Sequence, residues 1–541
     1  MKGEIALKIF IWIAVLVVVL VLVTPVIVEP LLQKKVQSAL NEKYKDYIVD
    51  IDKVHLSLIS SAVELKNITL ASKQQHSGNK DLNGEIESVK FKGVSLLKAL
   101  FKKDFDIDEV IISNYTIIGK VSFPKKAKPP TISHSNIRIG KLLVDKINLV
   151  LEDSSTSKAF SVKEGILKVY NIQIEKLDTL HGIVKQFDFE AEELLSVSTD
   201  SMYTFKASGI TYSDSLNNLS LNGLSIQPNY KDYDFAARHE YETDRVEAVF
   251  SNIYLYNFPA ATYFKSGNLI SSYIEIGKMD LNVFRDKRKQ FEHVNKPAFQ
   301  EMIYNYYSAV RIDSIGLKSG NITYTEHVEK ANEPGSISMN ELVTRIYNVT
   351  NDTIYKTENA SMEMKAEALL MGKGKITVAL KAKLFDNQNT FSLNGTLSDI
   401  EAKELNPMLE KNAFVYATSG KIEKMNFSFT ADNTKATGQL TMLYNGLDLA
   451  VKNKRTDDTT AIKERIMSII ANKKALNSNP VPGEEVRIGI IDYERDPEKF
   501  LFNYCFKSIL SGIKSSLIKN TTEKKEKKTL IQKIFGKPDD K

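Results

Sequence analysis

The sequence predicts a mainly β protein that one N-terminal transmembrane helix ties to a membrane. The first observation is a run of twenty uncharged residues, 9–28, which Lys8 and Glu29 flank. A helix of that length covers about 30 Å, the thickness of the hydrocarbon core of a bilayer. The second is an alternation of apolar and polar residues, with a period of two, over most of the chain after residue 49. The third is that helical periodicity is confined to a few segments.

The apolar run is interpreted as an uncleaved anchor, and a removed signal peptide is the alternative. A signal peptide has a shorter apolar region and a small-x-small cleavage site, whereas this run ends in Thr24-Pro25 and continues into Glu29-Pro30. No second run reaches membrane-spanning length, so about 510 residues should lie on one side of the membrane. Lysines flank both ends of the helix, and loop charge therefore does not decide which side that is.

Composition excludes some classes of function. The content of 43% hydrophobic and 26% charged residues is that of an ordinary folded protein. The net charge is +6, but residues 519–541 carry eight lysines against four acids, which leaves only +2 for the rest. No broad basic surface is implied, and no nucleic-acid partner is expected. Cys505 is the only cysteine, so no intramolecular disulfide can form.

After the anchor, a short amphipathic helix is expected from apolar side chains at every fourth position, and strands follow it. The helix positions are Leu32, Val36, Leu40 and Tyr44. Strands are expected at 49–58, 63–65, 68–70, 86–94, 110–123, 137–152, 159–174, 186–194, 202–212, 219–226, 235–241, 245–256, 273–285, 309–325, 344–349, 376–384, 425–431 and 438–444. The pattern predicts about 25 strands in an antiparallel sheet that is wetted on one face. Residues 124–135 hold three of the fourteen prolines and are expected to form a loop or linker.

The clearest alternation marks a candidate site near the C-terminus. Residues 425–429 and 438–444 each place apolar side chains at every second position, and the polar segment 432–435 lies between them. If the two strands pair as a hairpin, six apolar side chains line one patch. These are Met425, Phe427, Phe429, Leu440, Met442 and Tyr444.

Few helices are expected, at 95–103, 297–310, 462–472 and 496–519. In the last of these Asp496 is predicted to be the N-cap, and Pro497 the first helical residue. Its apolar face should pack on the final strands or on a bilayer surface. That face comprises Phe502, Phe506, Ile509, Ile513 and Leu517.

No catalytic, cofactor-binding or metal-binding motif is found, so the sequence does not predict an enzyme. The seven histidines are scattered and none has the spacing of a zinc protease. The segment 372–375 resembles part of a phosphate loop, but it lacks the first glycine and the hydroxyl residue that would bind magnesium. Residues 155–158 match S-x-x-K without the partner motifs of a penicillin-binding enzyme. The basic 520–541 tail is interpreted as disordered, with attachment to an anionic bilayer as the alternative.

Several segments resemble a known family when they are taken in order. The anchor and the segments 49–58 and 65–70 are similar to the start of AsmA-like proteins of Gram-negative bacteria. Residues 390–515 resemble the C-terminal region of this family, in a form that is typical of Bacteroidetes-type bacteria. The matching segments there are 393–397, 405–409, 419–429, 436–444, 447–449 and 488–496. The middle of the chain agrees with the family only in its strand rhythm.

The resemblance implies a fold, a location and a function. The fold would be an elongated, curved, taco-like antiparallel β-groove of the bridge-like lipid-transfer type with a few capping helices. The chain would be single-pass in the bacterial inner membrane, with its bulk in the periplasm. It would hold phospholipid and contribute to lipid transport to the outer membrane, or to homeostasis of that membrane, with no cofactor. In such a groove, part of the apolar patch formed by the six residues from Met425 to Tyr444 would face lipid. A partner at the far end is left unidentified, and the chain is short for a complete bridge.

Two alternatives stay open at this point. Alternation of apolar and polar residues is the same whether an apolar face is filled by its own side chains, as in a sandwich or barrel, or is open to acyl chains. The rival function is a periplasmic scaffold for outer-membrane assembly that carries no lipid. The expected domains are 1–30 (anchor), 31–123 (N-terminal groove module), 124–385 (central groove), 386–519 (AsmA-like C-terminal region) and 520–541 (basic tail).

Overall fold

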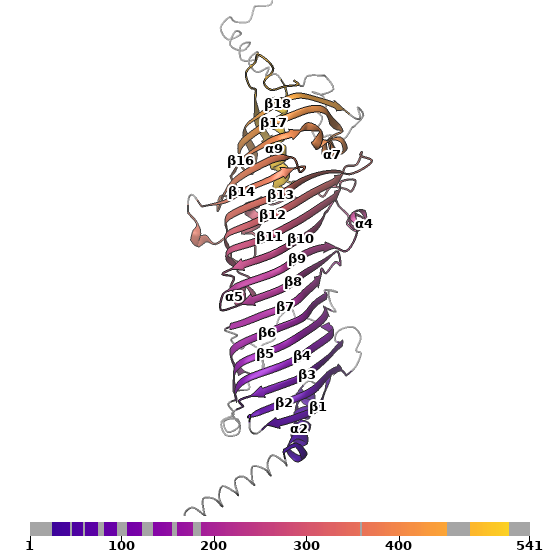
Figure 1. Cartoon of the computed structure of the whole chain (residues 1–541), viewed down its shortest axis with the longest axis vertical. Coiled ribbons are helices and arrows are strands. Elements are labelled where there is room, and N and C mark those ends of the chain that lie inside the picture. The colour runs from indigo at the N-terminus through magenta and orange to yellow at the C-terminus, as the bar shows by residue number, and fades with distance from the viewer. Residues whose placement is uncertain are drawn as a thin grey trace, which may run out of the picture. The chain divides into compact units, whose positions relative to one another are not determined.

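A computed structural model of the chain confirms the coarse fold class, which is mainly β with few helices. The structure describes residues 24–43, 46–57, 60–73, 81–94, 105–121, 134–153, 159–176, 186–357, 360–451 and 476–518. Nineteen described strands form an open sheet, and they follow one another in chain order (Figure 1). The chain divides into two compact units, residues 1–229 with 251–265 and residues 230–250 with 266–541, here called unit 1 and unit 2.

The described residues of unit 1 form nine strands, and each strand pairs with the next along the chain. The strands are β1 Tyr47–Ser57, β2 Ala62–Ser72, β3 Asp81–Lys92, β4 Phe105–Val121, β5 His134–Asp153, β6 Ala159–Lys176, β7 Gln186–Val197, β8 Tyr203–Ser213 and β9 Asn218–Pro228. Its helical segments are the π-helical turn η1 Thr24–Val28, α2 Glu29–Lys43 and α5 Ala260–Ser266. All described pairings in this series are antiparallel except that of β4 with β5, which is parallel.

Several strands of unit 1 contain residues with a left-handed backbone, and one of these residues joins two strands that are expected separately. Asn67 falls between the expected strands 63–65 and 68–70, but it has φ 49° and lies within β2. Asn114 and Lys146, with φ 50° and 53°, lie opposite each other in β4 and β5. A residue in the left-handed region inside a strand bends that strand and increases its twist. At Asn67 such a residue joins the two expected strands 63–65 and 68–70 into β2, and the described residues form 19 strands, fewer than the expected number of about 25.

Helix α2 confirms the predicted amphipathic helix and also covers an edge of the sheet. Its apolar side chains, Leu32, Val36 and Leu40, pack on buried residues of β1 and β2. Its polar side chains satisfy backbone groups of β1: the amide of Asn41 donates to Val49 O at 3.0 Å and accepts from Val49 N at 2.9 Å. A sheet edge with free N–H and C=O groups is a site of unwanted pairing, and α2 removes that site at β1.

Unit 2 contains a second series, in which each strand from β11 to β19 pairs with the next. The strands are β11 Leu269–Asp286, β12 Val310–His327, β13 Gly335–Thr350, β14 Ser361–Leu370, β15 Gly374–Lys383, β16 Phe391–Glu401, β17 Val415–Ala431, β18 Lys435–Val451 and β19 Ile488–Glu494. Strand β10, Asp244–Tyr256, has residues in both units. The helical segments are α4 Asp232–Ala237, α6 Phe299–Tyr304, η2 Thr353–Tyr355, η3 Ala402–Leu405, α7 Asn406–Met408, η4 Leu409–Ala413 and α9 Leu501–Ser516.

Three local predictions for unit 2 are wrong. The expected strand 235–241 is instead the end of α4 and a turn, and Phe235 is 1% exposed. The expected helix 297–310 is reduced to α6, since β12 begins at Val310. The pairing of β11 with β12 is parallel, and a parallel pair requires a long crossover connection, which is the segment that contains α6.

The transmembrane prediction falls mostly outside the described residues. Within the described part of the chain, no helix has both the length and the apolar content needed to span a bilayer. Of the expected anchor only 24–28 is described, and residues 9–23 are not. The expected helices 95–103 and 462–472, most of the linker 124–135 and the tail 520–541 also lie outside the described residues.

Candidate functional site

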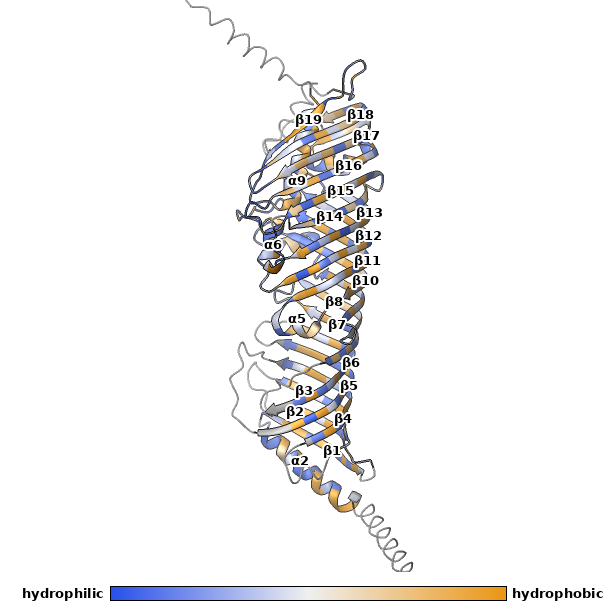
Figure 2. Cartoon of the chain, turned by 90° about the vertical axis from the view of Figure 1, so that its left-hand side faces the viewer, coloured by the Kyte–Doolittle hydropathy of each residue, from blue (hydrophilic) through white to orange (hydrophobic). Residues whose placement is uncertain are grey.

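One face of the unit 1 sheet carries a row of apolar residues that crosses every strand. Strand register places one apolar side chain from each of the nine strands side by side, in what we call the central row. It comprises Val54, Leu65, Val89, Ile112, Val144, Leu167, Phe189, Tyr212 and Leu219. The face that carries the central row is called the inner face. Figure 2 shows the matching alternation of apolar and polar colour along the strands.

A second row on the same face has almost the same character. It runs through Val49, Leu70, Gly84, Ile117, Leu149, Val162, Leu194, Ala207 and Leu224. Gly84 is the one position without a side chain, and Ile117 lies over it, since a Cβ there would be 3.0 Å from Ile117 Cγ1. The inner face of unit 1 is therefore a continuous apolar surface at least two rows wide.

This surface is only partly buried. Of the residues in the apolar cluster over β4 to β9, only Val144, Ile147, Val162, Ala191 and Ile210 are buried. Leu142, Leu149, Leu167, Phe189 and others in the same cluster stay partly exposed. A second layer of structure would bury such side chains completely, as in a sandwich.

Among the described residues, the helices on this face lie near its two ends. Helix α2 packs over β1 and β2. Helix α5 approaches β7, where the ring centroid of Phe264 is 6.5 Å from that of Phe187. Tyr212 is tied to the start of α5, because Ala260 N donates to its hydroxyl at 3.2 Å, and burial raises the pKa of Tyr212 to about 12. Between these ends, the inner face at β4, β5 and β6 has no described helix packed on it.

The opposite, outer face of unit 1 carries ion pairs between neighbouring strands. Glu109 on β4 accepts from Lys92 of β3 at 2.8 Å and from Lys141 of β5 at 3.1 Å. These hydrogen bonds lower the pKa of Glu109. Lys168 and Glu190 pair across β6 and β7 at 3.0 Å. Because exposed pairs each contribute about 0–1 kcal/mol, they identify the wetted face more than they stabilise it.

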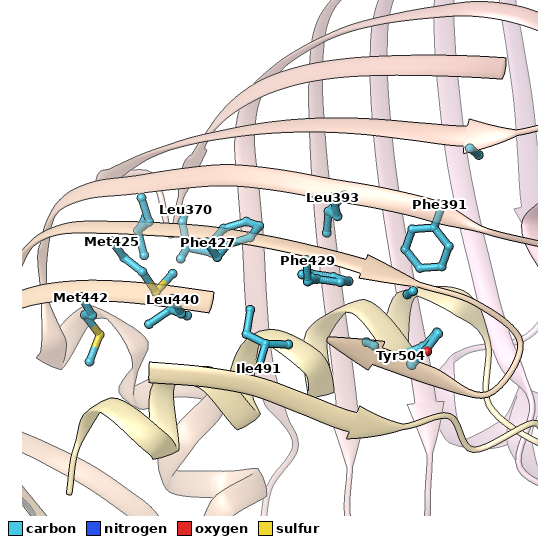
Figure 3. Packing of buried hydrophobic residues seen from close by; sticks show 14 of the residues in the cluster. Leu370, Phe391, Leu393, Met425, Phe427, Phe429, Leu440, Met442, Ile491 and Tyr504 are labelled. Atoms are coloured by element: carbon cyan, nitrogen blue, oxygen red, sulfur yellow. The ribbon is translucent and has the colours of Figure 1, made fainter. Parts of the chain in front are cut away.

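Unit 2 carries an equivalent apolar row, but its C-terminal end is covered. The row runs through Ile274, Ile315, Ile346, Met364, Leu380, Leu393 and Phe429. Ile346 and Leu380 are partly buried, whereas Leu393 and Phe429 are buried in a large core that also includes Tyr504 of α9. Here the sheet and α9 form two layers (Figure 3).

The six predicted site residues lie inside this covered part. The predicted hairpin is confirmed: β17 and β18 pair with Met425 opposite Met442 and Phe427 opposite Leu440. The six side chains share one face and are all buried, with exposed fractions between 0% and 5%. They pack against Ile491 of β19 and Tyr504 of α9 (Figure 3). At this end of the sheet the apolar face is therefore filled by the protein's own side chains.

The predicted packing of α9 on the final strands is confirmed in part, because the packed face overlaps the predicted one without coinciding with it. Its first helical residue is Leu501 and its N-cap is Phe500, while Asp496 accepts from Glu498 N instead. The buried positions recur every four residues and are small or polar: Tyr504, Ser508, Gly512 and Ser516. Of the predicted apolar face, Phe502 and Phe506 are 64% and 45% exposed, Ile509 and Ile513 are partly buried, and Leu517 is buried.

Close approach of the helix to β19 explains this choice of face. A Cβ on Gly489 would lie 2.2 Å from Gly512 O, and a Cβ on Gly512 would lie 2.8 Å from Ile491 Cγ1. Only glycine at both positions permits this contact between backbones. The buried hydroxyls are satisfied within the helix, since Ser508 Oγ donates to Tyr504 O at 2.8 Å. Small residues, not the largest apolar ones, therefore select the packed face.

The substitution Gly512→Val is expected to separate α9 from the sheet. Overpacking at a contact between backbones should reduce the free energy of unfolding of unit 2 by about 3 kcal/mol. Ser515→Val is the matched control, because it places the same β-branched side chain in the last turn of α9 and should cost less than about 1 kcal/mol. Urea denaturation of both variants measures the difference, and equal losses would show that the close contact has no energetic role.

In the described part of the chain, no group of three or more His, Cys, Asp and Glu residues is placed to hold a metal ion. No protein-family model matches the chain, and no curated protein matches it either. The AsmA-like resemblance therefore stays a prediction, and the partly exposed inner face of unit 1 is the candidate functional surface.

Proposed function

We propose that this protein is a membrane-anchored lipid carrier, whose unit 1 inner face holds the acyl chains of phospholipid. The observation that carries the proposal is the central row, an unbroken line of apolar side chains from nine successive strands, most of them partly exposed. Exposed apolar area costs about 25 cal/mol per Å², and contact with an acyl chain removes that cost. Each methylene that leaves water contributes about 0.8 kcal/mol.

The dimensions of the row suit acyl chains. Nine strands at a spacing of about 4.8 Å span about 38 Å, whereas the hydrocarbon of one bilayer leaflet is about 15 Å thick. The row is thus long enough for an acyl chain to move along it from strand to strand without leaving apolar contact. The uncharged run 9–28 supports a single-pass anchor in an inner membrane, with the bulk of the chain in the periplasm. Transport toward the outer membrane, or homeostasis of that membrane, is the role that this arrangement supports best.

A photo-crosslinking amino acid on each face tests lipid carriage. Ile117 lies on the inner face in the second row, and the adjacent Ile118 lies on the outer face, where it is 53% exposed. A crosslinker in place of Ile117 should capture phospholipid in cells, and one in place of Ile118 should not. Mass spectrometry of the adducts gives the readout.

The same experiment separates a carrier from a scaffold. Capture of lipid at neither position, by a chain that purifies without phospholipid, would contradict lipid carriage and favour a scaffold that organises envelope proteins. Equal capture at both positions would mean that the chain only lies near a bilayer, since Ile118 is turned away from the inner face.

A further inference from the structure

A third row of residues lies on the inner face of unit 1, beside the second row. On each strand from β4 to β9 it is two residues away from the second row, so the side chains are on the same face. The row comprises Gly119, Leu151, Phe160, Ser196, Phe205 and Ile226. Among the large apolar side chains that β1 to β9 place on the inner face, Phe160 and Phe205 are the most exposed, each at 38%. The most accessible apolar contacts of this face therefore lie on β6 and β8.

Ser196 of β7 lies between these two phenylalanines. In the strand register, Phe160 is opposite Ser196, and Ser196 is opposite Phe205. Tyr203 stacks on Phe205, with 6.2 Å between the ring centroids. Two strand spacings separate the backbones of Phe160 and Phe205 by about 9.6 Å. The three residues thus form a gap with an aromatic side chain on each side and a small side chain between them, which we call the aromatic slot.

The hydroxyl of Ser196 is not used by the fold. Ser196 is half-buried, and its hydroxyl forms no hydrogen bond with a described residue. Ser72 of β2 shows the contrast, because its hydroxyl donates to Leu82 O at 3.4 Å and accepts from Leu82 N at 2.9 Å. A polar group among apolar side chains costs free energy unless it is hydrogen-bonded. The aromatic slot therefore has one unused donor within an apolar surface.

The aromatic slot has no charged neighbour on the inner face. The residues next to it in the second row are Leu194 and Ala207. Glu193 and Lys206, which lie one residue further along these strands, pair with each other on the outer face at 2.6 Å. A phosphate or carboxylate in the aromatic slot would be desolvated without a cation, whereas a neutral carbonyl oxygen needs only one hydroxyl donor.

We propose that the aromatic slot binds the start of an acyl chain, with the Ser196 hydroxyl donating to the ester carbonyl oxygen of a glycerolipid. Carbon atoms in contact are about 3.5–4 Å apart, so one hydrocarbon chain between Phe160 and Phe205 can touch both rings. The rest of the chain would continue over the second and central rows, and the headgroup would lie beyond the third row. This inference rests on the proposed lipid function and adds to it the chemical group that is recognised.

Competition between two phosphatidylcholines tests the aromatic slot. The full-length chain in detergent is equilibrated with equal amounts of an ester-linked and an ether-linked phosphatidylcholine of the same chain length, and native mass spectrometry counts both bound forms. The ether-linked lipid has the same headgroup but no carbonyl oxygen. The unchanged chain should retain about threefold or more of the ester-linked lipid over the ether-linked lipid, and Ser196→Ala should retain both equally.

Ser161→Ala is the matched control. Ser161 is next to Phe160 on β6, but its side chain lies on the outer face, opposite Val150, so this variant should keep the preference for the ester. Because the Ser196 hydroxyl has no described partner, Ser196→Ala should leave the thermal midpoint of the chain unchanged. A lost preference then reports on the aromatic slot and not on folding.

The outcomes separate this inference from the proposed function. Equal retention of the two lipids by the unchanged chain, or the same preference in Ser196→Ala, would overturn the inference, while lipid capture at Ile117 would leave the proposed function intact. A parallel sample with palmitic acid separates the two sources of an acyl carbonyl. Retention of palmitic acid over both phosphatidylcholines, lost in Ser196→Ala, would overturn the ester assignment in favour of a free fatty acid. Retention of no lipid by any variant would contradict both the aromatic slot and the proposed function.

Discussion

Replacement of Phe427 by aspartate is expected to unfold unit 2, and not to produce a folded protein that has lost lipid. The Phe427 side chain is 4% exposed and lies opposite Leu440 and Gly395. Its ring fills the space over Gly395, where a Cβ would be 2.2 Å from Phe427 Cζ. Loss of a buried phenylalanine costs about 3–5 kcal/mol, and the buried carboxylate adds a further cost of several kcal/mol. Since a typical domain has about 5–15 kcal/mol of stability, this one substitution removes most of it.

Ser428→Asp is the matched control for this variant. Ser428 is the next residue of β17, lies on the outer face and donates to Asn394 Oδ1 at 2.6 Å. Its replacement should cost about 1 kcal/mol, the value of one exposed hydrogen bond. Urea denaturation with limited proteolysis distinguishes the two variants. If Phe427→Asp were as stable as Ser428→Asp, the core around Phe427 would have to be open in solution.

The strand pattern could be predicted from sequence because one face of the sheet is wet and the other is not. Alternation with a period of two identified most strands of both units, and it predicted the β17–β18 hairpin with its six apolar side chains on one face. The helix α2 followed from apolar residues at every fourth position. These features depend on residues that are close in sequence, so a short stretch of sequence is enough to predict them.

Features that depend on distant contacts could not be predicted in this way. Asn67 resembles a turn residue, yet its left-handed conformation bends a continuous strand. Phe235 fits an alternating pattern, but its neighbours form a short helix that buries it. The face of α9 that packs is chosen by the close approach of Gly512 to Gly489, which involves a strand more than twenty residues away in the chain.

The sequence predicts an alternating apolar surface, but it places the candidate site on β17 and β18, where the structure has a filled core. The six residues from Met425 to Tyr444 have the clearest alternation, but a filled core and an open groove produce the same alternation. What separates them is a second layer: α9 covers these six, whereas β4, β5 and β6 of unit 1 have no described helix over their inner face. The position of a covering helix is a tertiary property, and a period of two carries no information about it.

A second large effect is expected on lipid binding, and it concerns the inner face of unit 1. Ile117→Glu and Ile118→Glu make the same substitution at adjacent positions on opposite faces of β4. Ile117 is partly exposed, so its carboxylate can reach water and the cost to folding should be about 2 kcal/mol or less. Both variants should therefore remain folded, with thermal midpoints within a few degrees of each other.

Lipid content should nevertheless differ sharply between the two variants. The carboxylate at residue 117 stands in the second row, between Gly84 and Leu149, where the proposed acyl chain lies. A charge in contact with acyl chains costs more than about 1.4 kcal/mol, so phospholipid that copurifies with Ile117→Glu should fall at least tenfold. Ile118→Glu should retain lipid, because its side chain points away from that surface between Asn83 and Val150. Quantitative lipid mass spectrometry of the two purified proteins decides the matter, and equal lipid content in two folded variants would exclude the inner face of unit 1 as the carrier surface.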